Sequence, residues 1–341
     1  MTSRKNLRID WIDIAKGLGI ILVVLGHTER GLGSSGIAPE SWKYGLDFYL
    51  YTFHMPLFMF LAGLNVPHSL RAGRREFLMR KLPTIVWPYL LWSLIIGAVG
   101  TLLSSLTNNP GDWGDFAKIA WRPISPFWFL YALFVYCVVL AITGLRAVVL
   151  VPLSFLAFGV GLMFANDTLI QQLLHFLIFF VAGALLAPRL LGANREPAWW
   201  LVVAVTIAWF AVTAAVGAPS NHRYFSAWGL PSALLGISFM ILLAIKTKGL
   251  PSSVLAELGR ASMPIYVMHI LATAGTRIVL SRLYLTDSPL VYVVACTTAG
   301  VLGPYVGYLI LRRLRWLPAF GFGRNPPQST RALAPTGAAA G

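Results

Sequence analysis

The chain has 341 residues, of which 57% are hydrophobic and only 11% are charged, and its mean hydropathy is +0.71. These few polar residues cannot cover the surface of a water-soluble protein of this size. The composition therefore predicts an integral membrane protein. The formal net charge is +15, but the basic residues stand in short clusters between apolar runs, which is typical of topology-setting loops and excludes a nucleic-acid-binding face.

Apolar stretches long enough to cross the hydrocarbon core recur along the chain, at about 20 residues for each helix. We place about ten of them, at residues 11–29, 46–66, 82–105, 125–144, 147–165, 169–188, 197–217, 225–246, 261–281 and 289–311. The expected fold is an all-α bundle of about ten transmembrane helices, a single membrane domain over residues 1–317. The Pro-, Gly- and Ala-rich tail, residues 318–341, has no periodic apolar face, so we expect it to be disordered.

Basic residues predict how these helices are oriented. With the N-terminus in the cytoplasm, about 19 of the 27 Lys and Arg residues fall in cytoplasmic segments and about 6 fall on the opposite side, among them Arg30 and Arg122. We therefore expect both termini in the cytoplasm. Asp13 and Lys16 interrupt the first apolar run and no small-residue cleavage site follows it, so we expect an uncleaved first helix.

Two ionisable residues, Lys16 and His27, stand in this first helix. Such groups cost several kcal/mol at membrane depth unless protein or water receives them, so a functional role is the first hypothesis. The eleven-residue step is about 16 Å along a helix and close to three turns, so both side chains project from nearly the same face toward a common cavity. Gly17, Gly19 and Gly26 would let another helix or a ligand approach the backbone. The alternative is a snorkelling lysine and a histidine that bonds only a neighbouring helix.

The second expected helix carries Asp47, Tyr51 and His54 at positions i, i+4 and i+7, on one helical stripe. A carboxylate that orients a histidine raises its basicity, as a general base for a sugar hydroxyl requires. Asp47 and His54 are about 10 Å apart along the helix, so we expect Asp47 to serve His27 or the substrate instead. Pro56 is expected to kink the helix. Polar contacts that only join helices are the alternative.

Basic and aromatic residues elsewhere are less specific candidates. The cytoplasmic segment from Arg74 to Lys81 could hold the phosphates of a nucleotide-bearing donor, although such clusters most often set topology. Trp128 and His269 add an aromatic ring and an imidazole to later helices, where packing is the commoner role.

Two other features are easily interpreted. The external segment from Asn108 to Asp115 mixes carboxylates with a tryptophan, which suits sugar hydroxyls but equally a simple linker. Cys137 and Cys296 lie inside apolar stretches and indicate neither a disulfide framework nor a metal site.

Together these residues resemble the membrane-bound acyltransferase 3 family, whose hallmark is Arg or Lys, ten residues and then His in the first helix, here Lys16 and His27. The closer likeness is to its fucose 4-O-acetylase-like branch. It covers the membrane core and is carried by Asp10 to Gly17 (DWIDIAKG), Leu25 to Thr28 (LGHT), Phe53 to Phe58 (FHMPLF), Phe77 to Trp92, Trp128 to Leu130 and Leu258 to His269. Two departures stand out: Ala62 precedes Gly63 where the family more often has Ser, and no esterase-like domain follows the last helix, so we expect transfer to finish within the membrane domain.

The resemblance implies transfer of an acyl group, usually acetyl, from cytoplasmic acyl-CoA to a hydroxyl of a cell-surface or lipid-linked glycan. The protein would be a multi-pass protein of a bacterial cytoplasmic (inner) membrane, with acetyl-CoA as co-substrate and no metal. The implied catalytic residues are His27, His54 and Asp47, with His27 as the central base or as a transient acyl carrier. The donor would be bound by Lys16, Arg80 and Lys81, and the acceptor by Tyr51, Trp128 and His269.

A transporter or glycan flippase is the main alternative, because it would use the same buried charges as substrate or proton sites. No clear inverted repeat relates the two halves of the sequence, which counts against transport. An inactive scaffold is disfavoured, since it would retain costly ionisable residues without using them.

Overall fold

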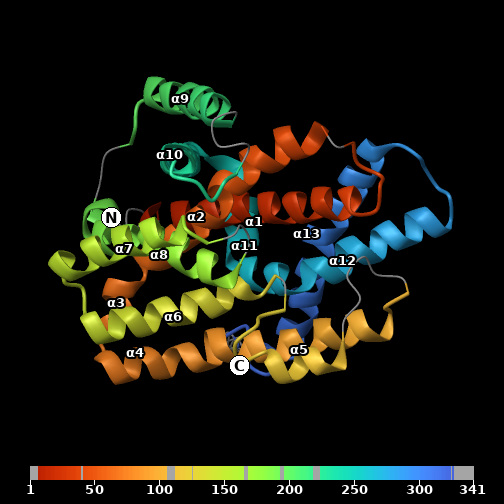
Figure 1. The fold of residues 1–341 in the computed structure, drawn as a ribbon, viewed down its shortest axis with the longest axis horizontal. Coiled ribbons are helices and arrows are strands. Elements are labelled where there is room, and N and C mark those ends of the chain that lie inside the picture. The colour runs from red at the N-terminus through yellow and green to blue at the C-terminus, as the bar shows by residue number, and fades with distance from the viewer. Residues whose placement is uncertain are drawn as a thin grey trace, which may run out of the picture.

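A computed structural model of the chain describes residues 7–39, 41–105, 112–124, 126–164, 168–192, 196–217, 223–323 and 325. Within these ranges the chain is helical and contains no β-strand (Figure 1). The α-helices are α1 (Leu7–Gly33), α2 (Phe48–Leu64), α3 (Val66–Leu70), α4 (Arg74–Lys81), α5 (Trp87–Leu102), α6 (Trp128–Thr143), α7 (Ala147–Gly161), α8 (Leu169–Gly192), α9 (Trp199–Gly217), α10 (Gly229–Lys246), α11 (Gly249–Arg260), α12 (Ser262–Arg282) and α13 (Pro289–Arg313). Two π-helical segments, η1 (Lys43–Asp47) and η2 (Leu82–Val86), lead into α2 and α5, and η3 (Trp113–Lys118) is a short 3-10 helix.

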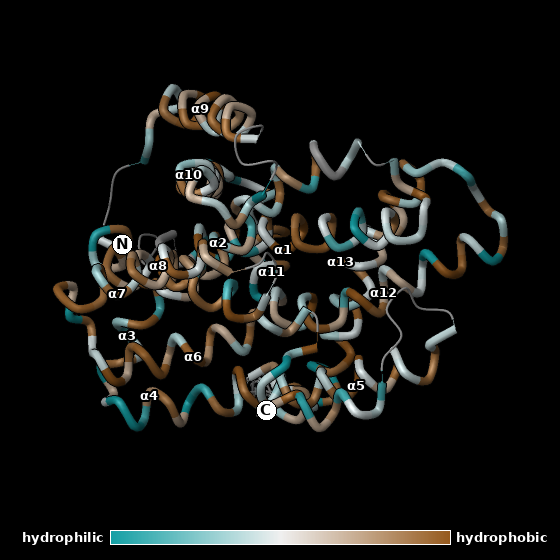
Figure 2. Tube along the Cα trace, viewed as in Figure 1, coloured by the Kyte–Doolittle hydropathy of each residue, from teal (hydrophilic) through white to brown (hydrophobic). Residues whose placement is uncertain are grey.

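The structure confirms the predicted all-α membrane bundle. In the described ranges, seven helical segments are long and apolar enough to cross a membrane: Asp10–Gly33, Arg74–Leu102, Leu169–Gly192, Trp199–Gly217, Gly229–Lys246, Ser262–Arg282 and Pro289–Arg313. The shorter helices α2, α6 and α7 coincide with the other three predicted spans. Figure 2 shows hydrophobic residues predominating along α8 and α9. The number of crossings and the side of each terminus stay predictions.

Helix α1 lies at the centre of the bundle, where it packs against α2, α10, α11, α12 and α13 (Figure 1). Its closest neighbour is α11, and glycines on both helices permit the approach. A Cβ atom on Gly17 would lie 2.0 Å from the backbone oxygen of Leu255, and one on Gly259 would lie 1.8 Å from that of Asp13. The prediction that small residues of α1 let another helix approach is therefore confirmed at Gly17.

Helix α11 itself was not predicted. It falls in the connection between the predicted spans 225–246 and 261–281, and its 12 residues are too few to cross a membrane. Its sequence, GLPSSVLAELGR, has no long apolar run that would predict a membrane span, and only Ala256, Leu258 and Gly259 are buried in the structure.

The first residues of the predicted tail, which begins at residue 318, pack against α5. The indole nitrogen of Trp87 donates to the backbone oxygen of Ala319 at 2.7 Å, and that of Trp92 donates to the backbone oxygen of Phe320 at 3.2 Å. Phe322 stacks on Trp92 with ring centroids 5.8 Å apart. Two tryptophans of α5 thus hold the start of the tail, a long-range contact that tail composition does not signal. Residues 326–341 lie outside the described part of the chain.

Candidate functional site

Three helices meet around His27, which lies near the C-terminal end of α1. The rings of His27 and His269, the latter on α12, have centroids 5.0 Å apart. The ring of Tyr51 on α2 lies 6.4 Å from that of His27, and it also contacts His54, at 4.5 Å between centroids. The absence of a side chain at Gly26 admits the Tyr51 ring, because a Cβ atom there would lie 3.0 Å from it.

A cavity of about 570 Å³ opens beside His27. It is lined by residues of α1, α2, α6, α8 and α12 and of three connections: His27, Arg30, Tyr51, His54, Met55, Arg122, Pro123, Pro126, Trp128, Thr168, Leu169, Gln172, Phe176, Tyr224, Phe225 and Tyr266. The connections precede α6, α8 and α10, and the basic-residue pattern predicts all three on the side opposite the cytoplasm. The cavity thus faces the predicted extracytoplasmic side.

Hydrogen bonds to the backbone show which ring nitrogen carries the proton in His54 and His269. His54 Nδ1 lies 2.6 Å from the backbone oxygen of Leu50, and His269 Nδ1 lies 2.6 Å from that of Tyr266. A carbonyl oxygen only accepts hydrogen bonds, so both Nδ1 atoms carry a proton, and each neutral ring presents Nε2 as an acceptor. Both Nε2 atoms are buried, and neither has a hydrogen-bond partner among the described residues. Each of these nitrogen atoms can accept a proton, or a hydrogen bond from a substrate hydroxyl group.

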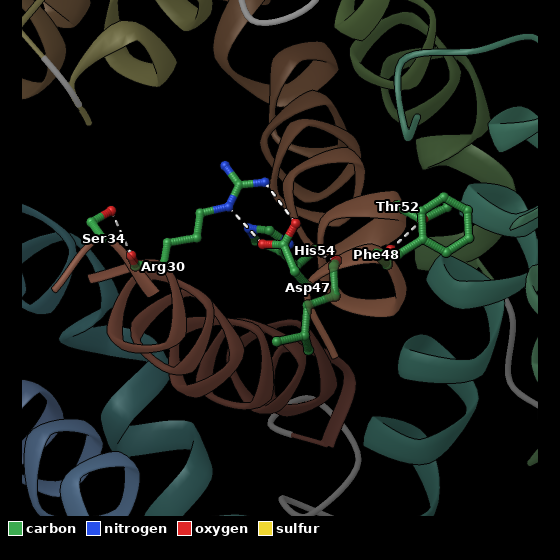
Figure 3. A network of polar contacts seen from close by, with 7 residues as sticks. Arg30, Ser34, Asp47, Phe48, Thr52 and His54 are labelled. Carbon is green, nitrogen blue, oxygen red and sulfur yellow. Dashed lines mark hydrogen bonds and ion pairs between the residues drawn. The ribbon is translucent and has the colours of Figure 1, made fainter. Parts of the chain in front are cut away.

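Arg30 is clamped beside this group of histidines (Figure 3). Its Nε donates to Asp47 Oδ1 at 2.6 Å and its Nη2 donates to Asp47 Oδ2 at 3.0 Å, a bidentate ion pair. The guanidinium carbon also lies 3.2 Å from the ring centroid of Tyr51 and 5.4 Å from that of Tyr224. These contacts fix the guanidinium between an acid and two aromatic rings.

The partner of Asp47 differs from the prediction. Asp47 was expected to serve His27 or the substrate, but the structure pairs it with Arg30. The reason is that α1 continues to Gly33, four residues beyond the predicted span, and so brings Arg30 opposite the start of α2. Glu29 is also buried there and interacts with Asp47. The sequence pattern does not indicate Arg30, because the predicted span ends at residue 29 and leaves Arg30 in a loop; Glu29 is the last residue of that span and no motif singles it out.

Lys16 does not line this cavity, so the common cavity expected for Lys16 and His27 stays a prediction. Its amino group lies 3.4 Å from Asp13 Oδ1, and α11 covers α1 at the adjacent Gly17. About 16 Å of α1 separates the two residues, and the buried side chains of Ile20, Val23 and Val24 lie between them.

The other predicted donor residues also lie outside the cavity. Arg80 pairs with Glu76 at 2.8 Å on the exposed face of α4, and Lys81 lies 5.0 Å from the ring centroid of Phe77.

Two of the three predicted acceptor residues line the cavity, and the third, His269, does not. Tyr51 and Trp128 line it, and Trp128 stacks on Phe176 with centroids 5.2 Å apart. His269 lies against His27. Helix α2 continues through Pro56, next to the cavity-lining Met55.

The external segment predicted from residue 108 to residue 115 does not line the cavity. Residues 108–111 of it lie outside the described ranges. Asp112 accepts a hydrogen bond from the backbone nitrogen of Gly114 at 2.5 Å and thereby caps η3. Among the residues with described positions, no three His, Cys, Asp or Glu side chains form a group that could hold a metal ion.

Comparison with known proteins identifies the family. A family model described as an acyltransferase domain, acyltransferase 3, matches residues 9–309. The nodulation protein NolL of Mesorhizobium japonicum is 29% identical over 222 residues, which cover 61% of this chain and 56% of that relative. The chain thus matches little more than half the length of the relative, and no solved structure matches it. The family expectation is confirmed, whereas the fucose 4-O-acetylase-like branch stays a prediction. The chain belongs to the acyltransferase 3 family.

Proposed function

We propose that this membrane acyltransferase transfers an acetyl group from acetyl-CoA to a hydroxyl of a cell-surface or lipid-linked glycan. The observation that carries the proposal is the position of His27 on the wall of a cavity of about 570 Å³. Two histidines lie beside it, and their Nε2 atoms have no hydrogen-bond partner in the part of the chain that the structure describes. Family membership supports acyl transfer. The cavity faces the predicted extracytoplasmic side, where a surface glycan is found.

The chemistry needs a base more than any other group, because a thioester is already activated. In the direct route His27 takes the proton of the acceptor hydroxyl, the hydroxyl oxygen bonds the acyl carbon, and the carbon–sulfur bond breaks. The departing CoA thiolate then takes the proton from His27. In the second route His27 attacks the acyl carbon first and CoA leaves as the thiolate. The acyl group then passes from His27 to the hydroxyl oxygen, and the hydroxyl proton goes to the thiolate. A protein-lined cavity limits attack by water in both routes.

The acceptor is proposed to lie against Tyr51 and Trp128, whose rings suit the apolar face of a sugar. His54 and His269 offer acceptor nitrogens to its hydroxyl groups. Asp47 acts through Arg30 rather than on a histidine.

The donor is proposed to approach from the cytoplasm, with Lys16, Arg80 and Lys81 near its phosphates. The Arg80–Glu76 pair is exposed, and such surface pairs contribute about 1 kcal/mol or less, so a phosphate can replace the carboxylate at little cost. The site would then lie in the cytoplasmic membrane, with the donor and the acceptor entering from opposite sides.

Mass spectrometry of surface glycans tests the proposal. Cells that produce the protein should carry glycans heavier by about 42 Da for each acetylated hydroxyl, the mass of C2H2O gained on acylation. His27→Ala should abolish this increment while the protein stays inserted at the wild-type level, measured by immunoblot of membranes. An unchanged increment in the His27→Ala cells would contradict the role of His27, and an unchanged glycan mass with and without the wild-type protein would contradict the function.

A further inference from the structure

We propose that Arg30 is a further catalytic residue, which stabilises the negative charge that develops on the acyl carbonyl oxygen during transfer. This inference rests on the proposed function. It concerns a residue that the sequence pattern assigned to a loop and that the structure places in the wall of the cavity.

Arg30 lies close to the proposed base, His27, along α1. Arg30 follows His27 by three residues on α1, a rise of about 4.5 Å, so their side chains leave the same face of the helix. Both line the same cavity. An acyl carbon within reach of a hydroxyl held at His27 therefore has its oxygen within reach of the guanidinium.

Arg30 is also held rigidly and keeps free donors. A guanidinium has five N–H donors, and Asp47 takes two of them, one on Nε and one on Nη2. The Tyr51 ring, at 3.2 Å from the guanidinium carbon, covers one face. Figure 3 shows the third nitrogen pointing away from Asp47. Donors fixed in advance where charge develops are the arrangement that stabilises an oxyanion.

Four neighbouring side chains are excluded from the same role, whereas the buried hydroxyl of Tyr51, which has no hydrogen-bond partner among the described residues, could assist Arg30 as a second donor. In their neutral forms His54 and His269 present acceptor nitrogens, so they repel rather than stabilise an oxyanion. The hydroxyl of Tyr266 already donates to the backbone oxygen of Pro126 at 2.5 Å. The other cavity arginine, Arg122, is exposed and lies in the connection before α6.

The step balances without a further reactant. The hydroxyl proton passes to His27, the oxygen–carbon bond forms, and the carbonyl electron pair moves to the oxygen that faces Arg30. When the pair returns, the carbon–sulfur bond breaks and the thiolate takes the proton from His27. Arg30 keeps all its protons and contributes only charge and hydrogen bonds.

The test compares Arg30→Gln with Arg30→Lys and with Arg122→Gln as the matched control, in full-length protein purified in detergent. The acceptor is surface glycan extracted from cells that lack the protein, and the donors are acetyl-CoA and fluoroacetyl-CoA. We expect Arg30→Gln to lower kcat with acetyl-CoA by about 10²–10³-fold, as loss of an oxyanion donor does, with the acceptor KM changed only a few-fold. Arg30→Lys keeps the positive charge but loses the planar guanidinium with its paired N–H donors, so we expect a smaller loss of kcat than in Arg30→Gln.

The second donor separates catalysis from structure. Fluorine withdraws electrons and stabilises the oxyanion itself, so the loss caused by Arg30→Gln and Arg30→Lys should be several-fold smaller with fluoroacetyl-CoA. The loss caused by Arg122→Gln should be the same with both donors. If Arg30→Gln does not fold, the donor dependence of Arg30→Lys decides the question.

Equal losses of kcat with both donors in the Arg30 variants would overturn the assignment. A raised acceptor KM with unchanged kcat would also overturn it, and would indicate instead that Arg30 binds an anionic acceptor. A wild-type protein that releases no CoA would instead contradict the proposed function, on which the assignment depends.

Discussion

His54 and His269 are completely buried, and each keeps an Nε2 atom without a hydrogen-bond partner among the described residues. A buried polar atom without a partner costs about 1–3 kcal/mol of stability. Both residues therefore fit a site that a substrate completes better than they fit a structural role. Because the unsatisfied nitrogen lowers stability, replacing it should affect the melting temperature and the transfer rate differently.

Replacing His54 with Phe should lower activity at least about tenfold without lowering the melting temperature, because the change removes an unsatisfied nitrogen and keeps a ring of similar shape. The backbone oxygen of Leu50 still accepts from the backbone nitrogen of residue 54 in the helix. Transfer rates and thermal unfolding in detergent measure both effects, with the exposed His68→Phe as control. A variant that melts earlier and keeps its rate would show that His54 is structural.

Among the helices, α1 is central to the proposed site, because it carries both Lys16 and His27 and packs against α11. The contact places backbone on backbone at Gly17 and Gly259, where no side chain fits. The packing of α11 therefore fixes the position and rotation of α1 and, through them, the direction of His27.

Gly17→Ala and Gly259→Ala should each destabilise the protein by about 1–3 kcal/mol, because the new Cβ atom would overlap a backbone oxygen of the other helix. Gly275→Ala in α12 is the matched control, since a Cβ atom there has no atom within 4 Å. It should leave stability unchanged or raise it by up to about 1 kcal/mol through helix propensity. Thermal unfolding of the three variants measures this, and equal melting temperatures would contradict the close packing of α1 and α11.

For the whole molecule, the sequence predicted the helices well because length and hydropathy are local properties. The close approach of another helix at Gly17 also followed from a local pattern, whereas Tyr51 and Trp128 were indicated by the family resemblance. What could not be predicted depends on contacts distant in sequence. Asp47 finds Arg30 rather than His27 only once α1 and α2 are packed, and the tail meets Trp92 of α5 only in the folded bundle.

The arrangement of the whole molecule also bears on how the two substrates meet. The cavity with His27 opens beside connections predicted to be extracytoplasmic, whereas Lys16 lies about three helical turns away, toward the predicted cytoplasmic end of α1. An acyl group delivered from the cytoplasm must therefore travel along α1 to reach the acceptor. A transporter would instead move the glycan itself through the bundle.

The most direct test of acyl transfer uses the purified full-length protein in lipid vesicles, with acetyl-CoA and surface glycan extracted from cells that lack the protein. We predict release of one CoA for each acetyl group that appears on the glycan, and no release with His27→Ala, because the thioester is consumed only in the transfer step. Movement of the glycan across the vesicle membrane without acetyl-CoA, and without release of CoA when acetyl-CoA is present, would contradict the account and favour transport.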